Sequence, residues 1–229
     1  ADAGGGTTRK THMRTTMAVG LALTIGLLAV GCRQQKVASS SMSDEQQTAL
    51  NTGLAELEAT LKDRSPFIFA RLAPAATDEE LAALRAGLEG VQVQCLELWY
   101  QWHNGCSGHT TDILPLGRML SISEALQDRR MIQGIPLVDA KRKRALKILE
   151  DGAGDGFFLD VASPTPRVFY HMLEDPFPRD YGSLQQLVTF INDVHVAGLA
   201  SEKESGMVVF DLARYQELEV NYLRKIGSP

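Results

Sequence analysis

The sequence predicts an α+β fold, with helices packed around an antiparallel sheet. Two sequence patterns and the length and composition of the chain support this prediction. Leucines recur at helical spacing in several segments, which is typical of amphipathic helices with one buried face. Short apolar runs between Gly, Asp and Pro turns fill the middle of the chain, which indicates strands joined as a meander. A chain of 229 residues, 44% of them hydrophobic, is large enough to bury a core of its own.

The N-terminal region has the features of a bacterial lipoprotein signal. Residues 1–12 are interpreted as upstream sequence and Met13 as the start, with basic residues around it. The apolar run Ala18–Val30 is short for a membrane span but suits a signal peptide. It leads into Leu28-Ala29-Val30-Gly31-Cys32, which resembles a lipobox, so Cys32 is the predicted site of lipid attachment. An ordinary signal or anchor with an incidental cysteine is the alternative.

Start and stop signals place helices in the first half of the chain. Ser43 with Gln46 forms a capping box, in which the two side chains satisfy free backbone N–H groups of the first turn. Thr77 with Glu80 forms another. Asn104-Gly105 is a signal for a helix end. The predicted helices run over Asp44–Asp63, from Thr77 to Gly90, and over Val93–His103.

After these helices the sequence changes to short alternating segments. Strands are predicted over Asp112–Leu116, Gly134–Val138, Ala145–Leu149, Phe157–Val161, Arg167–Met172 and Met207–Asp211. Helices are predicted from Ser121 or Ser123 to Gln127, from Ser183 to Val194, and over Leu212–Ile226. The strands between Ala145 and Met172 form an antiparallel meander, and Gly198–Gly206 is expected to be a linker.

The stretch Asp151–Asp160 is the first candidate for a bound ion or phosphate. Counted as a calcium loop from Asp151, it supplies Asp155 but has alanine at two positions where oxygen ligands are needed. The dinucleotide and phosphate-loop patterns fail as well. Asp151, Asp155 and Asp160 also have the chemistry for acid–base work, but turn formation by Gly and Asp explains them. The stretch is therefore predicted to be a hairpin turn.

Cysteine and histidine cluster around the end of the third helix. The chain has 3 cysteines, too few for a disulfide framework. His103, Cys106 and His109, with Cys95 upstream, have spacing compatible with zinc, but the paired signatures of zinc sites are missing. A Cys95–Cys106 disulfide is the alternative if the domain lies outside the cytoplasm. No metal site is therefore assigned.

Other charged and titratable residues give no catalytic pattern. The basic run Lys141–Arg144 is interpreted as a solvated loop or strand edge rather than a phosphate site, because the net charge is −5. That charge also gives no general attraction to nucleic acid. His171 and His195 are isolated, and motifs for a nucleophile are missing. We therefore predict no enzyme and no cofactor.

Four motifs in order resemble the SUKH superfamily, which includes the fungal Smi/Knr cell-wall regulators and bacterial toxin-immunity proteins. These motifs are Leu96–Gly105, which ends in His-Asn-Gly; Ile113–Pro115 with Leu120–Ala125; Asp151–Asp160; and Phe177 with Ser183–Asn192. The resemblance covers roughly Thr77 to His195. Gln92-Val93 stands where the family has Leu-Pro, and the insertion around Lys141–Arg144 is longer than usual. The family implies an α+β fold and binding of other proteins, and it offers no catalytic residues.

Together these features predict a lipid-anchored protein of the bacterial envelope whose domain has a curved antiparallel sheet flanked by helices. The expected segments are 1–32 (upstream sequence and signal peptide), 33–76 (tether and amphipathic helix), 77–195 (SUKH-like domain) and 196–229 (C-terminal extension). The resemblance implies a non-enzymatic protein-binding function, with a toxin as partner in an immunity role. Exposed loops over Asp139–Arg144 and Leu173–Tyr181 are expected to carry specificity. The alternative is a structural envelope lipoprotein that contacts cell wall or carbohydrate.

Overall fold

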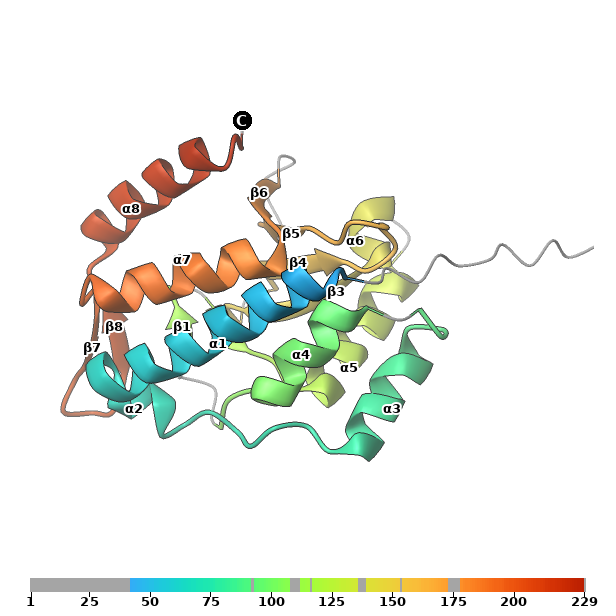
Figure 1. The fold of residues 1–229 in the computed structure, drawn as a ribbon, viewed down its shortest axis with the longest axis horizontal. Coiled ribbons are helices and arrows are strands. Elements are labelled where there is room, and N and C mark those ends of the chain that lie inside the picture. Colours follow the sequence, from blue (N-terminus) through green and yellow to red (C-terminus); the bar gives the residue numbers. More distant parts are fainter. Residues whose placement is uncertain are drawn as a thin grey trace, which may run out of the picture. The chain divides into compact units, whose positions relative to one another are not determined.

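The structure is a computed structural model, and it describes residues 42–91, 93–107, 112–115, 117–135, 139–152, 154–172 and 178–228. All of these lie within one compact unit that spans residues 37–229. The fold is α+β, as predicted, with a six-stranded antiparallel sheet that curls into a half-barrel and helices around it (Figure 1). Cys32, the predicted lipid site, lies outside the described residues.

The described helices and strands follow one another along the chain with short connections. The helices are α1 (Asp44–Arg64), α2 (Pro66–Phe69), α3 (Asp78–Gly87), α4 (Gln94–Trp102), α5 (Ile122–Gly134), α6 (Ala140–Arg144), α7 (Leu184–Val196) and α8 (Leu212–Lys225). The strands are β1 (Asp112–Leu114), β2 (Gly117–Met119), β3 (Ala145–Glu150), β4 (Gly156–Asp160), β5 (Val168–His171), β6 (Arg179–Gly182), β7 (Ala200–Glu202) and β8 (Val208–Phe210). Within this part of the chain, none of the helices has the length and apolar content that a membrane crossing needs.

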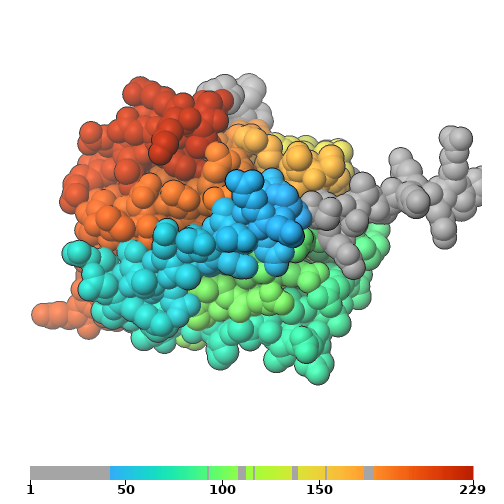
Figure 2. All heavy atoms as spheres, in the orientation of Figure 1, coloured from blue at the N-terminus to red at the C-terminus, as the bar shows by residue number. Residues whose placement is uncertain are grey.

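Helices α1 and α7 lie side by side across the molecule (Figure 1). Both begin with capping boxes: the one at Ser43 was predicted, and at Ser183 a simple cap was predicted. The leucine stripe of α1, from Leu50 to Leu61, is buried in the same core as the apolar face of α7. In the space-filling view α1 fills the space between α7 and α4 (Figure 2). The helix that precedes the predicted SUKH-like domain therefore shares the core of that domain.

The main sheet has its strands in chain order, from β1 at one edge to β6 at the other. The predicted meander is confirmed, because β3 pairs with β4 and β4 with β5, all antiparallel. Side chains alternate between the two faces of the sheet. Phe157 and Leu159 of β4 face the main core, whereas Phe158 joins a small second cluster with Ile132 and Phe169. Helices α5 and α6 contact the sheet at β3 and β4 and cover this second cluster.

The His-Asn-Gly segment after α4 forms a tight corner. The side-chain Oδ1 of Asn104 accepts from the backbone N–H of Ile122 at 2.8 Å and so satisfies a free donor in the first turn of α5. Gly105 has a φ of +92°, and a Cβ there would lie 2.6 Å from the backbone nitrogen of Ser121. Only glycine fits this approach, because it has no Cβ and tolerates positive φ. The residues of this motif therefore build the corner between α4 and α5.

Three predicted elements need correction. The helix that begins after Ser121 continues to Gly134, because Ile132 anchors its last turn in the second cluster. A strand that starts at Gly134 is therefore wrong, and residues 136–138 lie outside the described part. The predicted linker Gly198–Gly206 contains β7, which pairs with the predicted strand β8. Strands β2 and β6 were not anticipated.

A candidate binding cleft at the mouth of the half-barrel

The turn Asp151–Asp155 joins β3 to β4, as predicted. The backbone N–H of Asp151 donates to the carbonyl of Asp155 at 3.3 Å, and Gly152 and Gly154 have φ of +83° and +106°. Asp160 lies at the other end of β4, where its Oδ1 accepts from the N–H of Ala162 at 3.2 Å. The three aspartates that acid–base chemistry would need are therefore not brought together.

The residues of the possible zinc site are separated. His103 donates Nδ1–H to the carbonyl of Ala73 at 2.5 Å, and His109 lies outside the described residues. Among the described residues, no group of three or more His, Cys, Asp or Glu side chains is placed to hold a metal ion.

The Cys95–Cys106 disulfide is not formed, and both cysteines are free thiols. Cys95 stands in the first turn of α4 and Cys106 beyond its end. Burial raises the pKa of Cys95 to about 12 and that of Cys106 to about 11, so both thiols keep their protons at neutral pH.

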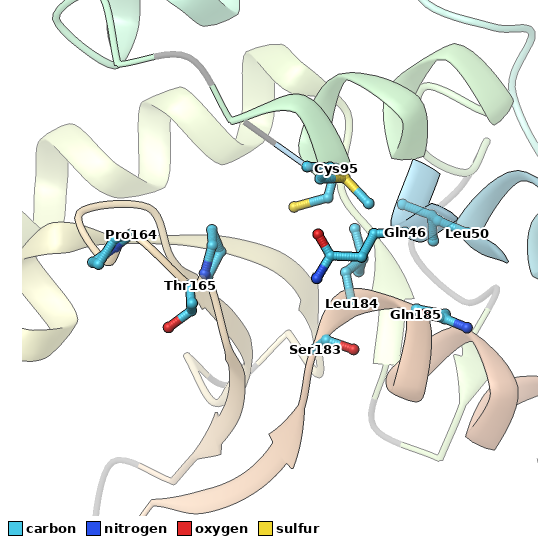
Figure 3. A pocket seen from close by; sticks show the side chains of 10 residues that line it. Gln46, Leu50, Cys95, Pro164, Thr165, Ser183, Leu184 and Gln185 are labelled. Atoms are coloured by element: carbon cyan, nitrogen blue, oxygen red, sulfur yellow. The ribbon is translucent and has the colours of Figure 1, made fainter. Parts of the chain in front are cut away.

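Cys95 lines a pocket of about 170 Å³ between the first turns of α1 and α7 and the turn after β4 (Figure 3). Among the described residues the lining has no charged side chain; it combines Leu50 and Leu184 with Gln46 and Gln185. A protonated thiol among apolar and amide groups provides neither a nucleophile nor a metal ligand.

The basic run Lys141–Arg144 forms α6, so the predicted solvated loop or strand edge is wrong. Asp139 caps this helix, with its Oδ1 accepting from the N–H of Arg142 at 2.9 Å. The Arg142 guanidinium is buried 5.1 Å above the Phe158 ring, and Lys141 lies 4.2 Å above the Phe169 ring. The cations therefore cover the aromatic cluster on the outer face of the sheet, as cation–π contacts do. Of the two predicted specificity loops, 139–144 is thus largely helical, and residues 173–177 of the other lie outside the described part.

The two isolated histidines, His171 and His195, contact groups that belong to the fold. His195 is fully buried, donates Nε2–H to the carbonyl of Ile113 and accepts from the Ser65 hydroxyl at Nδ1, both at 2.9 Å. Burial lowers the pKa of His195 to about 4, so the ring is neutral. His171 Nε2 lies 3.8 Å from a carboxylate oxygen of Asp139.

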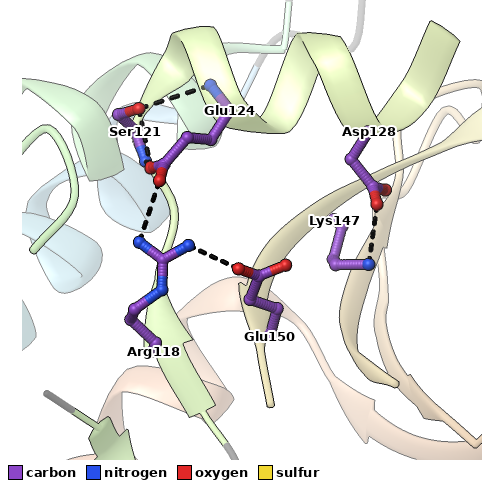
Figure 4. A network of polar contacts seen from close by, with 6 residues as sticks. All are labelled: Arg118, Ser121, Glu124, Asp128, Lys147 and Glu150. Atoms are coloured by element: carbon purple, nitrogen blue, oxygen red, sulfur yellow. Dashed lines mark hydrogen bonds and ion pairs between the residues drawn. The ribbon is translucent and has the colours of Figure 1, made fainter. Parts of the chain in front are cut away.

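A closed polar network joins β2, β3 and α5 (Figure 4). Arg118 is buried and donates to Glu124 at 2.9 Å and to Glu150. Glu124 also accepts from the backbone N–H and the hydroxyl of Ser121, both at 2.8 Å, and so completes the cap of α5. The guanidinium is thus held between two carboxylates, and the network ties the helix start to the sheet.

A cleft of about 240 Å³ lies between α8, strands β4 to β6 and Pro115, the residue that follows β1. We call it the mouth cleft. The sheet contributes Phe157, Tyr170, Arg179 and Tyr181, α8 contributes Leu212, Tyr215, Gln216 and Glu219, and Pro115 and Met172 complete the lining. Its floor is aromatic, because the Phe157 ring centroid lies 4.9 Å from those of Tyr170 and Tyr181.

Glu219 is the polar centre of the mouth cleft. Glu219 is 7% exposed, and its carboxylate accepts from the Tyr181 hydroxyl and lies 3.5 Å from the Tyr215 hydroxyl. Arg179 donates to the same carboxylate at 3.3 Å. The charge of Glu219 is thus stabilised by two phenols and one guanidinium.

Tyr170 differs from the other tyrosines of the mouth cleft. Its side chain is 7% exposed, yet its hydroxyl makes no hydrogen bond within the described part of the chain. Burial and then the charges of Asp151 and Asp155 raise the pKa of Tyr170 to about 12. A buried hydroxyl without a partner costs stability, so a group that pairs with it is favoured.

The sequence patterns did not identify the mouth cleft, because its residues come from the middle and the end of the chain. One signal was available in α8. Tyr215, Glu219 and Tyr222 stand at positions i, i+4 and i+7, on one face of the helix, and all three are buried. A carboxylate between two tyrosines on a buried face indicates a polar site rather than plain core packing.

No model of a known protein family matches this chain, and no curated protein matches it at a significant level. The resemblance to the SUKH superfamily therefore stays a prediction from the motifs.

Proposed function

We propose that the chain is a non-enzymatic protein-binding protein, held at a bacterial membrane by a lipid on Cys32, with a toxin-immunity role. The mouth cleft is the observation that carries the binding function. Tyrosine and arginine are the residue types that contribute most to protein interfaces, and the mouth cleft presents Tyr170 and Arg179 beside the exposed Leu212.

The corner after α4 supports the same proposal from another direction. Asn104 and Gly105 belong to the motif that resembles the SUKH superfamily, and both have architectural contacts. A motif that builds a scaffold suits a family whose members share a fold and bind different partners. Function then depends on the surface that the scaffold presents.

The immunity role is tested by co-expression. The full chain is expressed together with each toxin encoded beside its gene, and growth is measured. We expect the wild-type chain to restore growth with one of these toxins, and purified toxin to bind the purified chain. Failure to protect against every such toxin, or binding of peptidoglycan fragments in place of protein, would contradict the proposal.

The lipid anchor is tested separately. Mass spectrometry of the mature protein from a bacterial host should give an N-terminal Cys32 with added acyl mass, and Cys32→Ser should release the chain from the membrane fraction. An unmodified peptide that spans Cys32 would contradict lipidation and leave the binding function standing.

A further inference from the structure

We propose that the mouth cleft receives a lysine or arginine side chain from a positively charged segment of the partner protein, with the Tyr170 hydroxyl as an acceptor. This inference rests on the proposed protein-binding function and specifies its chemistry. Its starting point is the unpaired Tyr170 hydroxyl, which is buried at the lining of an otherwise well-paired cleft.

The charges around the mouth cleft select a cation. Asp151 and Asp155, in the turn between β3 and β4, are close enough to act on Tyr170. Asp112 lies near the same turn, because it pairs with Arg118 in the sheet and Arg118 pairs with Glu150, the residue before Asp151. Phe157, which follows this turn, pairs with Tyr170, so the negative charges of Asp151 and Asp155 lie toward the Tyr170 side of the cleft and favour a cation there over an anion.

The nearby guanidinium groups do not cancel this preference. Arg179 lies 3.3 Å from Glu219, and Arg118 is held by Glu124 at 2.9 Å and by Glu150. Arg179 and Arg118 are therefore each already matched by at least one carboxylate, and Arg142 donates to the carbonyl of Gly154 in the aspartate turn at 2.9 Å.

The shape and lining suit one long side chain. A volume of about 240 Å³ is smaller than the pockets that hold whole drug-sized ligands, about 300–1,000 Å³. The rings of Phe157, Tyr170 and Tyr181 line the cleft, and an ammonium or guanidinium group is attracted to aromatic rings. The N–H groups of that cation then supply the donor that the Tyr170 hydroxyl lacks.

The surroundings also fit an extended segment rather than a free ion. β6 is the last strand of the sheet, and the carbonyl of Tyr181 on it already accepts from the Tyr222 hydroxyl of α8 at 2.7 Å, so a partner segment would lie across the rim of the mouth cleft rather than extend the sheet. Leu212, 58% exposed, stands on the rim and offers an apolar contact for a neighbouring side chain. A basic residue flanked by apolar ones matches this arrangement.

The test uses the purified full chain in detergent and two fluorescent pentapeptides with blocked ends, Gly-Leu-Arg-Leu-Gly and its counterpart with Glu in place of Arg. Fluorescence anisotropy measures affinity. We expect the Arg peptide to bind, with an affinity that falls as salt is raised, and the Glu peptide to bind at least tenfold more weakly. Tyr170→Phe should lower the affinity for the Arg peptide about tenfold, which is the typical effect of losing a hydrogen bond to a charged group.

Tyr100→Phe is the matched control. The Tyr100 hydroxyl also makes no hydrogen bond within the described residues, but Tyr100 is fully buried in the core and does not line the mouth cleft. This variant should bind the Arg peptide like the wild type. Thermal unfolding of both variants verifies that each is folded.

The outcomes separate this inference from the proposed function. No binding of the Arg peptide, equal or tighter binding of the Glu peptide, or an affinity unchanged by Tyr170→Phe would overturn the inference. If Tyr170→Phe also keeps full protection in the toxin assay, the protein-binding function stands and its surface lies elsewhere. The wild-type chain could fail to protect against the toxins while Tyr170→Phe still lowers the affinity for the Arg peptide. In that case the proposed chemistry of the cleft stands and the immunity role is contradicted.

Discussion

The Arg118 network and the mouth cleft both place a buried charge among polar partners, but only one of them is complete. Arg118 is held by two carboxylates, and Glu124 at the same time caps α5 (Figure 4). In the mouth cleft Glu219 has partners, whereas the neighbouring Tyr170 hydroxyl has none within the described residues. The contrast separates polar groups that hold the fold together from a polar group that remains available to a ligand.

Breaking the complete network should have the largest effect. Arg118→Leu leaves the carboxylates of Glu124 and Glu150 facing each other without their cation, so we expect the free energy of unfolding to fall by about 4 kcal/mol. Urea denaturation measures it. Arg85→Leu is the control, because Arg85 makes a similar two-bond contact with Glu97 at the surface. Its loss should change stability little, and a loss as large as that of Arg118→Leu would remove the distinction between the two pairs.

The buried His195, whose two ring nitrogens both have hydrogen-bond partners, should make the free energy of unfolding depend on pH. The pKa of His195 is about 4 in the folded protein and about 6.5 in an unfolded chain, so between these values only the unfolded state binds the proton. Stability from this group is therefore present above pH 6.5 and lost as the pH falls toward 4, by about 3 kcal/mol. Urea denaturation at pH 7 and pH 4 measures the difference.

The variant His195→Gln isolates that effect, because it keeps a donor for Ile113 but cannot titrate. The comparison is needed because Asp112 works in the opposite direction. Its raised pKa, about 6, means that the folded state binds the extra proton and is favoured as the pH falls. Parallel pH profiles of wild type and His195→Gln would show that His195 is not a buried neutral ring.

Two tyrosines sharpen the comparison: Tyr181 in the mouth cleft, and Tyr222, which is hydrogen-bonded to it from α8. Tyr181→Phe removes a donor to the buried carboxylate of Glu219, and we expect it to cost about 2 kcal/mol of stability. Urea denaturation and a thermal melt report the change. Tyr222→Phe, which loses a 2.7 Å hydrogen bond to the uncharged carbonyl of Tyr181, should cost less, about 1 kcal/mol. The reverse order would mean that Glu219 does not depend on the Tyr181 hydroxyl.

The smallest effect on stability is expected at Tyr170. Tyr170→Phe removes a hydroxyl that has no partner, so stability should stay within about 0.5 kcal/mol of the wild type or rise slightly. The same measurement on Tyr181→Phe provides the contrast. A loss of about 2 kcal/mol at Tyr170 would reveal a hydrogen bond in the folded protein and place Tyr170 with the complete networks.

The parts of the fold with local signals were predictable. Capping boxes mark the starts of three helices, at Ser43, Thr77 and Ser183, and each box involves residues only three positions apart. The strands β3 to β5 follow from apolar runs between Gly, Asp and Pro turns. Each of these signals depends only on residues that are close together in the sequence.

The parts that depend on distant residues were not predictable in the same way. The run Lys141–Arg144 is hydrophilic by composition, and its helix is explained by aromatic rings of β4 and β5 beneath it. The mouth cleft joins Tyr170 to Glu219, 49 positions further along the chain (219 − 170). The contacts that hold both features are tertiary, and a short window of sequence does not record them, although the cap at Asp139 and the Lys/Arg run also favour a helix locally.

The position of α1 has a mechanical consequence. Any pull on the N-terminal segment reaches the folded domain first through Ser43 and the start of α1. The helix is held along its length by leucines from Leu50 to Leu61. Such a force would therefore have to break the contacts between α1 and α7 one after another. The leucine stripe therefore sets how much load the domain withstands at its point of attachment.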